Sequence, residues 1–180
     1  MANDGILFQT GYSANNLLQI TFFIENRNGF PAANAFITCV PGVNTNTGRS
    51  YDYNAKLTLK TSAFKILSLA EAIDGLIDRG KNFPIGFSIF ADPSKSSFNA
   101  NAQNLAIKSI GIDLSTNNKT NIPQLVIFCN QQNIFNKSIF MSLPEAKAFA
   151  HVLRKLATRA IEFESAEAAK AISNKQQMQQ

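Results

Sequence analysis

The chain has 180 residues, of which 45% are hydrophobic and 16% charged, with a formal net charge of +5 at pH 7. This composition is typical of a globular protein and excludes a chain that is disordered over most of its length. No stretch approaches the roughly 18 apolar residues that cross a bilayer, so we expect no membrane association. The charge is compatible with a polyanionic partner but is well short of that of a histone-like polycation.

The first sixty residues have the alternation of β-strands. Residues 17–26 place one set of side chains on each face of a strand. The apolar face carries Leu18, Ile20, Phe22 and Ile24, and the other face carries Gln19, Thr21, Phe23 and Glu25. Residues 50–60 alternate in the same way. Their inward set is Tyr53, Ala55, Leu57 and Leu59, and their outward set is Asn54, Lys56, Thr58 and Lys60.

Residues 62–79 form a predicted helix with one buried face, and Gly80 follows as a residue that ends it. Its apolar stripe consists of Ile66, Leu69, Ala70, Ile73, Leu76 and Ile77. Turn sequences rich in Gly, Pro and Asn separate the remaining segments of strand-like alternation. These predicted strands span residues 6–12, 34–41, 84–91, 104–114, 124–131 and 137–142.

A second helix is predicted to begin at the sequence Ser-Leu-Pro-Glu. Ser142 and Glu145 have the spacing of a capping box, and Pro144 lies in the first turn, where its missing N–H costs nothing. The apolar stripe fades after Phe163 into a Gln-rich end. We expect residues 164–180 to be a helical or disordered tail.

The predicted order is four strands, a helix, four strands and a helix. Strands in runs joined by short turns favour antiparallel pairing, so the predicted class is α+β, with two four-stranded antiparallel β-sheets that are each followed by a helix. No linker divides the chain, and we expect a single domain over residues 1–163.

Two cysteines, Cys39 and Cys129, each lie within an apolar run and are predicted to be buried reduced thiols. The first residues lack the basic and apolar regions of a signal peptide. We therefore expect a cytoplasmic protein of a bacterial or phage-infected cell, or one of an organelle matrix if a leader has been removed.

Enzyme motifs are not found in the sequence. The single histidine, His151, lies in the second predicted helix without Cys or His at metal-binding spacing. No dinucleotide fingerprint, P-loop or nucleophile elbow occurs. Asp92 and Asp113 lie near strand ends, but Asp92 precedes Pro93 as an ordinary turn opener. We expect a non-enzymatic protein without metal or cofactor.

Aromatic side chains on polar strand faces are the candidate binding residues. Most of the 15 phenylalanines are expected in the core, but alternation places Phe23, Phe90 and Phe140 among small or polar outward residues. Such residues can stack on the bases of a single strand, at about 1–3 kcal/mol per base. A subunit interface has the same pattern, and the sequence leaves both interpretations open.

Cations on the outer sheet faces supply a candidate basic stripe. It begins with Arg49, Lys56 and Lys60 on or before one strand. It is extended by Lys95, Lys108 and Lys137. Each lysine alone is typical of a solvated surface, whereas a row of them can track a phosphate backbone.

The element order resembles that of the Whirly proteins, plant single-stranded-DNA-binding proteins. They share their fold with the guide-RNA-binding proteins of kinetoplastid mitochondria and have a duplicated relationship to positive cofactor four. Three stretches are similar to the family, namely YDYNAKLTL (51–59), FSIFADPSK (87–95) and residues 126–153. The similarity spans about residues 50–161, and the earlier part matches by strand count.

The resemblance implies a homotetramer in which the second helices pack centrally and the sheets radiate as blades. Single-stranded DNA would lie along the blade edges, with bases against aromatic and apolar side chains. The chain departs from the family at residues 9–17 (QTGYSANNL), which lack the lysines of the family's Lys-Gly-Lys-Ala-Ala-Leu motif.

We therefore expect a single-stranded-DNA-binding protein, largely sequence-independent, that acts in DNA replication, recombination or repair. One alternative keeps the fold and takes RNA as partner. The other is a structural or protein-interaction module in which Phe23, Phe90 and Phe140 are buried between subunits.

Overall fold

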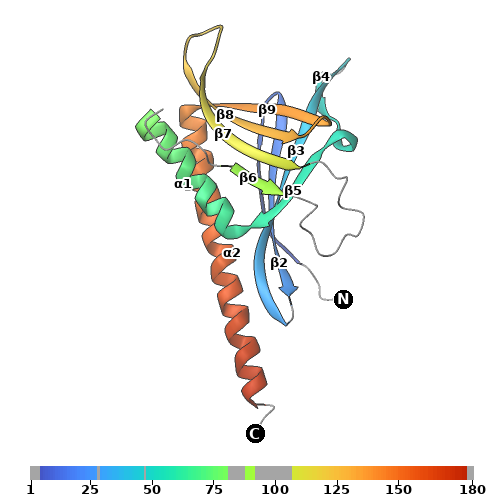
Figure 1. Cartoon of the computed structure of the whole chain (residues 1–180), viewed down its shortest axis with the longest axis vertical. Coiled ribbons are helices and arrows are strands. Elements are labelled where there is room, and N and C mark those ends of the chain that lie inside the picture. Colours follow the sequence, from blue (N-terminus) through green and yellow to red (C-terminus); the bar gives the residue numbers. More distant parts are fainter. Residues whose placement is uncertain (1–4, 28, 47, 81–87, 92–106, 178–180) are drawn as a thin grey trace.

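The chain folds into two antiparallel sheets, each followed by a helix, which confirms the predicted α+β class (Figure 1). The structure is a computed structural model that describes residues 5–27, 29–46, 48–80, 88–91 and 107–177. Among these residues, no helix is both long and apolar enough to cross a membrane.

The first sheet has five strands, one more than predicted. It consists of β1 (Ile6–Ser13), β2 (Asn16–Arg27), β3 (Phe30–Thr45), β4 (Gly48–Tyr51) and β5 (Leu57–Ser62). The strands β1 to β4 are neighbours in chain order, and β5 pairs with β3. The long strand β3 pairs with β4 through its last four residues, Gly42–Thr45, and with β5 through its middle.

The strand predicted over residues 50–60 is interrupted by a 3₁₀ turn, η1 (Tyr53–Ala55). Asp52 caps this turn by accepting a hydrogen bond of 3.0 Å from the backbone N–H of Asn54. Leu57 and Leu59 are buried as predicted, but Tyr53 and Ala55 are exposed instead of inward. A capped turn removes these two residues from the alternation of the strand that follows.

Helix α1 (Ala63–Arg79) follows β5 directly and confirms the predicted helix. Ser62 caps it by accepting from the backbone N–H of Lys65, at 3.3 Å. Gly80 ends it with φ 59° while its N–H bonds to the carbonyl of Leu76, a conformation that favours glycine.

The second sheet has the order β6-β7-β8-β9. Its strands are β6 (Ser88–Ala91), β7 (Lys108–Thr116), β8 (Pro123–Gln131) and β9 (Phe135–Ser142). The starts of two predicted strands, residues 84–87 and 104–106, lie outside the described residues.

Helix α2 (Leu143–Gln177) begins with the predicted capping box. The backbone N–H and the hydroxyl of Ser142 both donate to Glu145, at 2.9 and 2.6 Å, and the N–H of Glu145 donates back to the hydroxyl. The hydrogen bonds from Ser142 hold the pKa of Glu145 below its ordinary value. The helix continues well beyond Phe163, where the apolar stripe fades.

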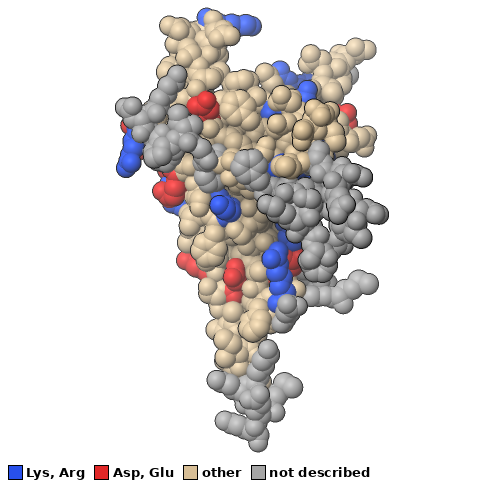
Figure 2. All heavy atoms as spheres, in the orientation of Figure 1, with Lys and Arg blue, Asp and Glu red and all other residues tan. Residues whose placement is uncertain are grey.

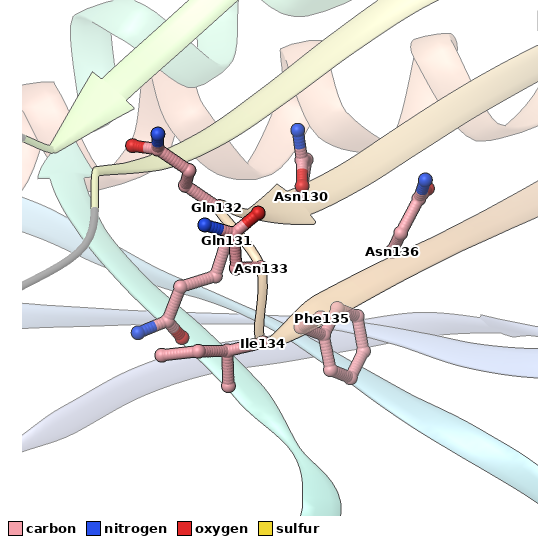
Figure 3. A pocket seen from close by; sticks show the side chains of 7 residues that line it. All are labelled: Asn130, Gln131, Gln132, Asn133, Ile134, Phe135 and Asn136. Carbon is pink, nitrogen blue, oxygen red and sulfur yellow. The ribbon is translucent and has the colours of Figure 1, made fainter.

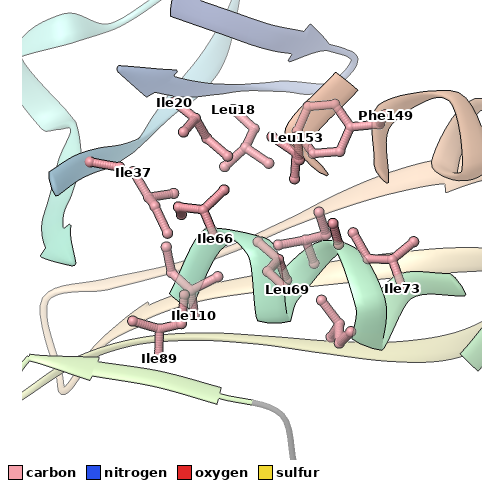
Figure 4. Packing of buried hydrophobic residues seen from close by; sticks show 14 of the residues in the cluster. Leu18, Ile20, Ile37, Ile66, Leu69, Ile73, Ile89, Ile110, Phe149 and Leu153 are labelled. Carbon is pink, nitrogen blue, oxygen red and sulfur yellow. The ribbon is translucent and has the colours of Figure 1, made fainter. Parts of the chain in front are cut away.

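The core lies between the two sheets and both helices. Figure 4 shows side chains of α1, α2 and both sheets converging in one cluster. Cys39 on β3 and Cys129 on β8 are free, fully buried thiols, as predicted. They meet across the core, and contact with Cys39, together with burial, raises the pKa of Cys129. The inner faces of the two sheets therefore face one another.

Polar contacts join the elements at the rim of this core. The amide of Asn16 donates to the carbonyl of Ser138 on β9, at 2.8 Å, and accepts from the N–H of Gly42 on β3, at 3.1 Å. Arg154 on α2 pairs with both Glu71 and Asp74 on α1. Asn16 thus connects the first sheet to the second, and Arg154 connects the two helices.

Candidate nucleic-acid interface

On the outer face of the first sheet, the exposed ring is that of Phe36, at 38%, and not that of the predicted Phe23. Phe23 points away from the main core, as alternation predicts, but it is only 6% exposed. Its ring stacks on that of Phe36 from β3, with centroids 4.6 Å apart and planes 17° apart. The ammonium of Lys60 lies 5.5 Å from the Phe23 ring centroid. Phe23 therefore packs within its own subunit.

Lys60 is occupied by an ion pair on the same face. Its ammonium donates to Glu25 at 2.5 Å, and Arg27 donates to the other carboxylate oxygen of Glu25 at 2.7 Å. The hydrogen bond from Lys60 is the main reason that the pKa of Glu25 is lowered. A phosphate that approached Lys60 would have to compete with this carboxylate.

Lys108 is also committed to a contact within the protein. Its ammonium donates to the backbone carbonyl of Thr58, at 3.0 Å, and so joins β7 to β5. Arg49 on β4 is exposed and donates to the carbonyl of Ala14, at 3.2 Å.

Two of the predicted cations are exposed without a side-chain partner among the described residues, namely Lys56 and Lys137. Lys95 lies outside the described residues. On the face that Figure 2 shows, the described Lys and Arg side chains lie apart, with Asp and Glu among them. Lys137 pairs with the buried Cys129 and so has inner-face parity, and Lys108 is bonded to Thr58, so the described predicted cations do not all lie on the outer sheet faces.

The outer face of the β8–β9 hairpin carries two exposed aromatic side chains. Phe140 is 40% exposed, as its predicted outward position requires, and Phe128 is 41% exposed. Phe128 pairs across the strands with Ser138, and Phe140 pairs with Val126, so the two rings are diagonal neighbours on one face. Such neighbours lie within reach of each other in antiparallel sheets.

Phe90 belongs by register to the same outer face. It pairs with Ser109 on β7, and Ser109 pairs with Asn130 on β8. Asn130 has the outward parity of Phe128. The side chain of Phe90 lies outside the described residues, so only its place in the strand is fixed.

The hairpin ends in a polar turn that surrounds a hollow of about 470 Å³ (Figure 3). The residues that line it are Asn130, Gln131, Gln132, Asn133, Ile134, Phe135 and Asn136. Asn133 adopts φ 60°, which closes the turn. The hollow lies at the end of the aromatic face and one residue before the exposed Lys137.

Two features of this hairpin were missed in the sequence. Phe128 lies between the inward residues Ile127 and Cys129, and its outward position follows from the same alternation that identified Phe140. The amide-rich turn appears in the sequence only as a turn signal. Its hollow depends on how the two strands separate at Asn133.

Comparison with known proteins gives no family model, curated protein or solved structure that matches the chain. Among the described residues, no group of three or more His, Cys, Asp or Glu side chains has a geometry that could hold a metal ion. The function is therefore inferred from the exposed side chains of the β8–β9 hairpin.

Proposed function

We propose that this protein binds single-stranded DNA, largely independently of sequence, through the outer face of the β8–β9 hairpin. The observation that carries the proposal is the pair of exposed rings, Phe128 and Phe140, side by side on one sheet face. Bases of an extended strand stack on such rings, at about 1–3 kcal/mol per base, and every base has a π-face.

Exposed cations near the hairpin and on the first sheet would supply the attraction for phosphate. Lys137 on β9 is exposed, although it pairs with the buried Cys129 and therefore lies on the opposite face of the sheet from Phe140. The net charge of +5 favours association with a polyanion. Lys56 and Arg49 are further exposed cations on the first sheet. Lys60 and Lys108, by contrast, have structural partners and are not assigned to phosphate.

The element order supports the proposal through its resemblance to the Whirly proteins. Two antiparallel sheets, each followed by a helix, are consistent with that topology. On this basis we propose a homotetramer in which α2 helices of different subunits pack together, and a role in DNA replication, recombination or repair. The exposed apolar residues Val152 and Phe163 on α2 are available for such packing.

The experiment is fluorescence anisotropy with a labelled mixed-sequence DNA strand of about 30 nucleotides, at low and moderate salt. Duplex DNA and an RNA strand of the same sequence serve as competitors. Preference for the DNA strand, with affinity that falls steeply with salt, supports the proposal. Tighter binding of the RNA strand would assign the surface to RNA. No binding at low salt would contradict both.

Phe128 and Phe140 would serve equally in a protein interface, because exposed aromatics are also enriched there. Size-exclusion chromatography with light scattering on alanine variants of the two residues separates these functions. A smaller oligomer with unchanged DNA affinity would assign the rings to subunit contact.

A further inference from the structure

Two thiols meet where the inner faces of the two sheets pack together. Cys39 on β3 and Cys129 on β8 are both fully buried, and both are free thiols. A side-chain hydrogen bond joins them. They are the two cysteines of the chain, so the fold brings its whole complement of thiols, one from each sheet, into a single contact.

A hydrogen bond between the sheets lies on one flank of this thiol pair. The amide of Asn16 donates to the carbonyl of Ser138, at 2.8 Å. Asn16 lies two residues before the β2 residue that pairs with Cys39. Ser138 directly follows the β9 residue that pairs with Cys129. Because an asparagine side chain is short, the two sheets approach closely at this flank.

A second hydrogen bond between the sheets lies on the other flank. The ammonium of Lys108 donates to the carbonyl of Thr58, at 3.0 Å. Thr58 directly follows the β5 residue that pairs with Cys39. Lys108 lies two residues before the β7 residue that pairs with Cys129. The flanking strands therefore correspond, β2 to β9 and β5 to β7, and they place β3 opposite β8 independently of the thiol contact.

Facing sheets can be joined by a disulfide through their common core, as in the immunoglobulin fold. Such a bond requires Cα atoms about 4.4–6.8 Å apart. With the thiols already in contact, a small approach of β3 to β8 would meet this requirement. Burial and the contact with Cys39 raise the pKa of Cys129. This thiol therefore stays protonated at neutral pH, and we expect it to react slowly.

We propose that Cys39 and Cys129 form a redox site, at which a peroxide oxidises the two thiols to a disulfide that links the two sheets. One thiol loses its proton and attacks a peroxide oxygen, the O–O bond breaks, and the leaving hydroxide takes the proton to become water. The second thiol attacks the resulting sulfenic acid, so that the S–S bond forms, the S–O bond breaks and a second water leaves. The protein loses two electrons and two protons, and the peroxide is reduced to water.

The test treats the reduced full chain with hydrogen peroxide under native conditions and then unfolds it in the presence of a maleimide label. The reduced chain should take up two labels and the oxidised chain none, since both thiols are then in the disulfide. The oxidised chain should have lost two hydrogens by mass and should run as a monomer on a non-reducing gel. Because both thiols are buried, we expect oxidation to take hours, and dithiothreitol should restore both labels.

The disulfide should also raise the urea midpoint of unfolding by about 1 M or more, because it closes a long loop in the unfolded chain. C39A and C129A are the matched controls. Each keeps one thiol and cannot form the bond within the chain, so peroxide should not raise its midpoint. If either variant fails to fold, the label count and the midpoint of the unaltered protein still decide.

Two free thiols after prolonged peroxide treatment would overturn the proposal, and so would added oxygen atoms in place of the loss of two hydrogens. A disulfide between two chains, or one that forms only in urea-unfolded protein, would overturn it as well. A disulfide that lowers the midpoint would show that the bond strains the native contact between the sheets. None of these outcomes bears on the proposed DNA binding, which the redox site does not require.

Discussion

The ammonium of Lys108 on β7 donates a 3.0 Å hydrogen bond to the backbone carbonyl of Thr58 on β5. The contact is partly buried and joins strands of the two different sheets. The β5 carbonyl is thereby satisfied by a charged donor of the other sheet. Lys108, which the sequence suggested as a phosphate ligand, thus holds the two sheets together.

Replacing Lys108 by methionine should lower the free energy of unfolding by about 1–2 kcal/mol, because a hydrogen bond from a charged group is lost and the Thr58 carbonyl is left without it. The salt dependence of DNA binding should not change. Urea unfolding measures the stability, and anisotropy at several salt concentrations measures the salt dependence of DNA binding.

The matched change is Lys137→Met, at an exposed lysine on β9 of the same sheet. Its stability should stay within about 0.5 kcal/mol of the unaltered protein. Its salt slope should fall by about one, as expected for loss of one phosphate contact. The reverse outcome, with Lys137→Met destabilised and Lys108→Met weakened in salt dependence, would refute both assignments.

Phe128→Ala and Phe140→Ala should each weaken DNA binding by about five- to 150-fold, because each ring is expected to stack on a base worth about 1–3 kcal/mol. Anisotropy titration measures the effect. Stability should change much less than for a core phenylalanine, since both rings are about two-fifths exposed.

A matched control for this pair is Phe64→Ala on helix α1, an element outside the β8–β9 hairpin, where the ring is 57% exposed. Its DNA affinity should equal that of the unaltered protein. An equal loss of affinity in Phe64→Ala would mean that the effect comes from general damage and not from stacking.

The ion pair between Glu25 and Lys60 should make stability depend on acid. The folded pKa of Glu25 lies below its ordinary value of 4.5, chiefly through the hydrogen bond from Lys60. Its contribution is therefore complete above 4.5 and is lost as the pH falls through the lowered value. Because both side chains are partly exposed, it should be under about 1 kcal/mol.

Urea unfolding of the unaltered protein and of Glu25→Gln, from neutral to strongly acidic pH, tests this. The difference in stability between them should be constant at neutral pH and vanish in acid. Lys60→Met is the control, because it keeps apolar contact with Phe23 and removes the pair. A difference that grows in acid would contradict the assignment.

The capping box at the start of α2 should be worth about 1 kcal/mol. Ser142→Ala and Glu145→Ala should each lower stability by about that amount, and the double variant should lose less than the sum, because the two side chains share their bonds. Thermal unfolding followed by circular dichroism measures the loss. Glu145→Gln retains an acceptor and should keep most of the stability. If it loses as much as Glu145→Ala, the negative charge and not the hydrogen bond stabilises the helix start.

Local signals in the sequence were sufficient for the helices and for most strands. Ser62, Ser142 and Glu145 mark helix starts through their own side chains, so their bonds depend on residues three positions away. The inward positions of Leu57 and Leu59 follow from alternation alone. These features are confirmed because their causes lie within a few residues.

The binding surface was predicted less well because its properties depend on residues distant in the chain. Alternation puts Phe23 on the polar face, but only strand pairing shows that Phe36 stacks on it. Lys60 and Lys108 are distinguished from Lys137 by partners 35 and 50 residues away. Exposure is thus a property of the assembled sheets.

Helix α2 also contacts the first sheet, although it follows the last strand of the second sheet. Glu164 accepts a 2.7 Å hydrogen bond from the backbone N–H of Ala33 on β3, and the helix then runs on past the sheets to its C-terminal end (Figure 1). The stretch from Glu164 to Gln177 is a lever arm of about 20 Å. A rotation of about 10° at Glu164 would swing its end through about 3 Å, so a dye at the exposed Asn174 would magnify small tilts of β3 into a readable displacement.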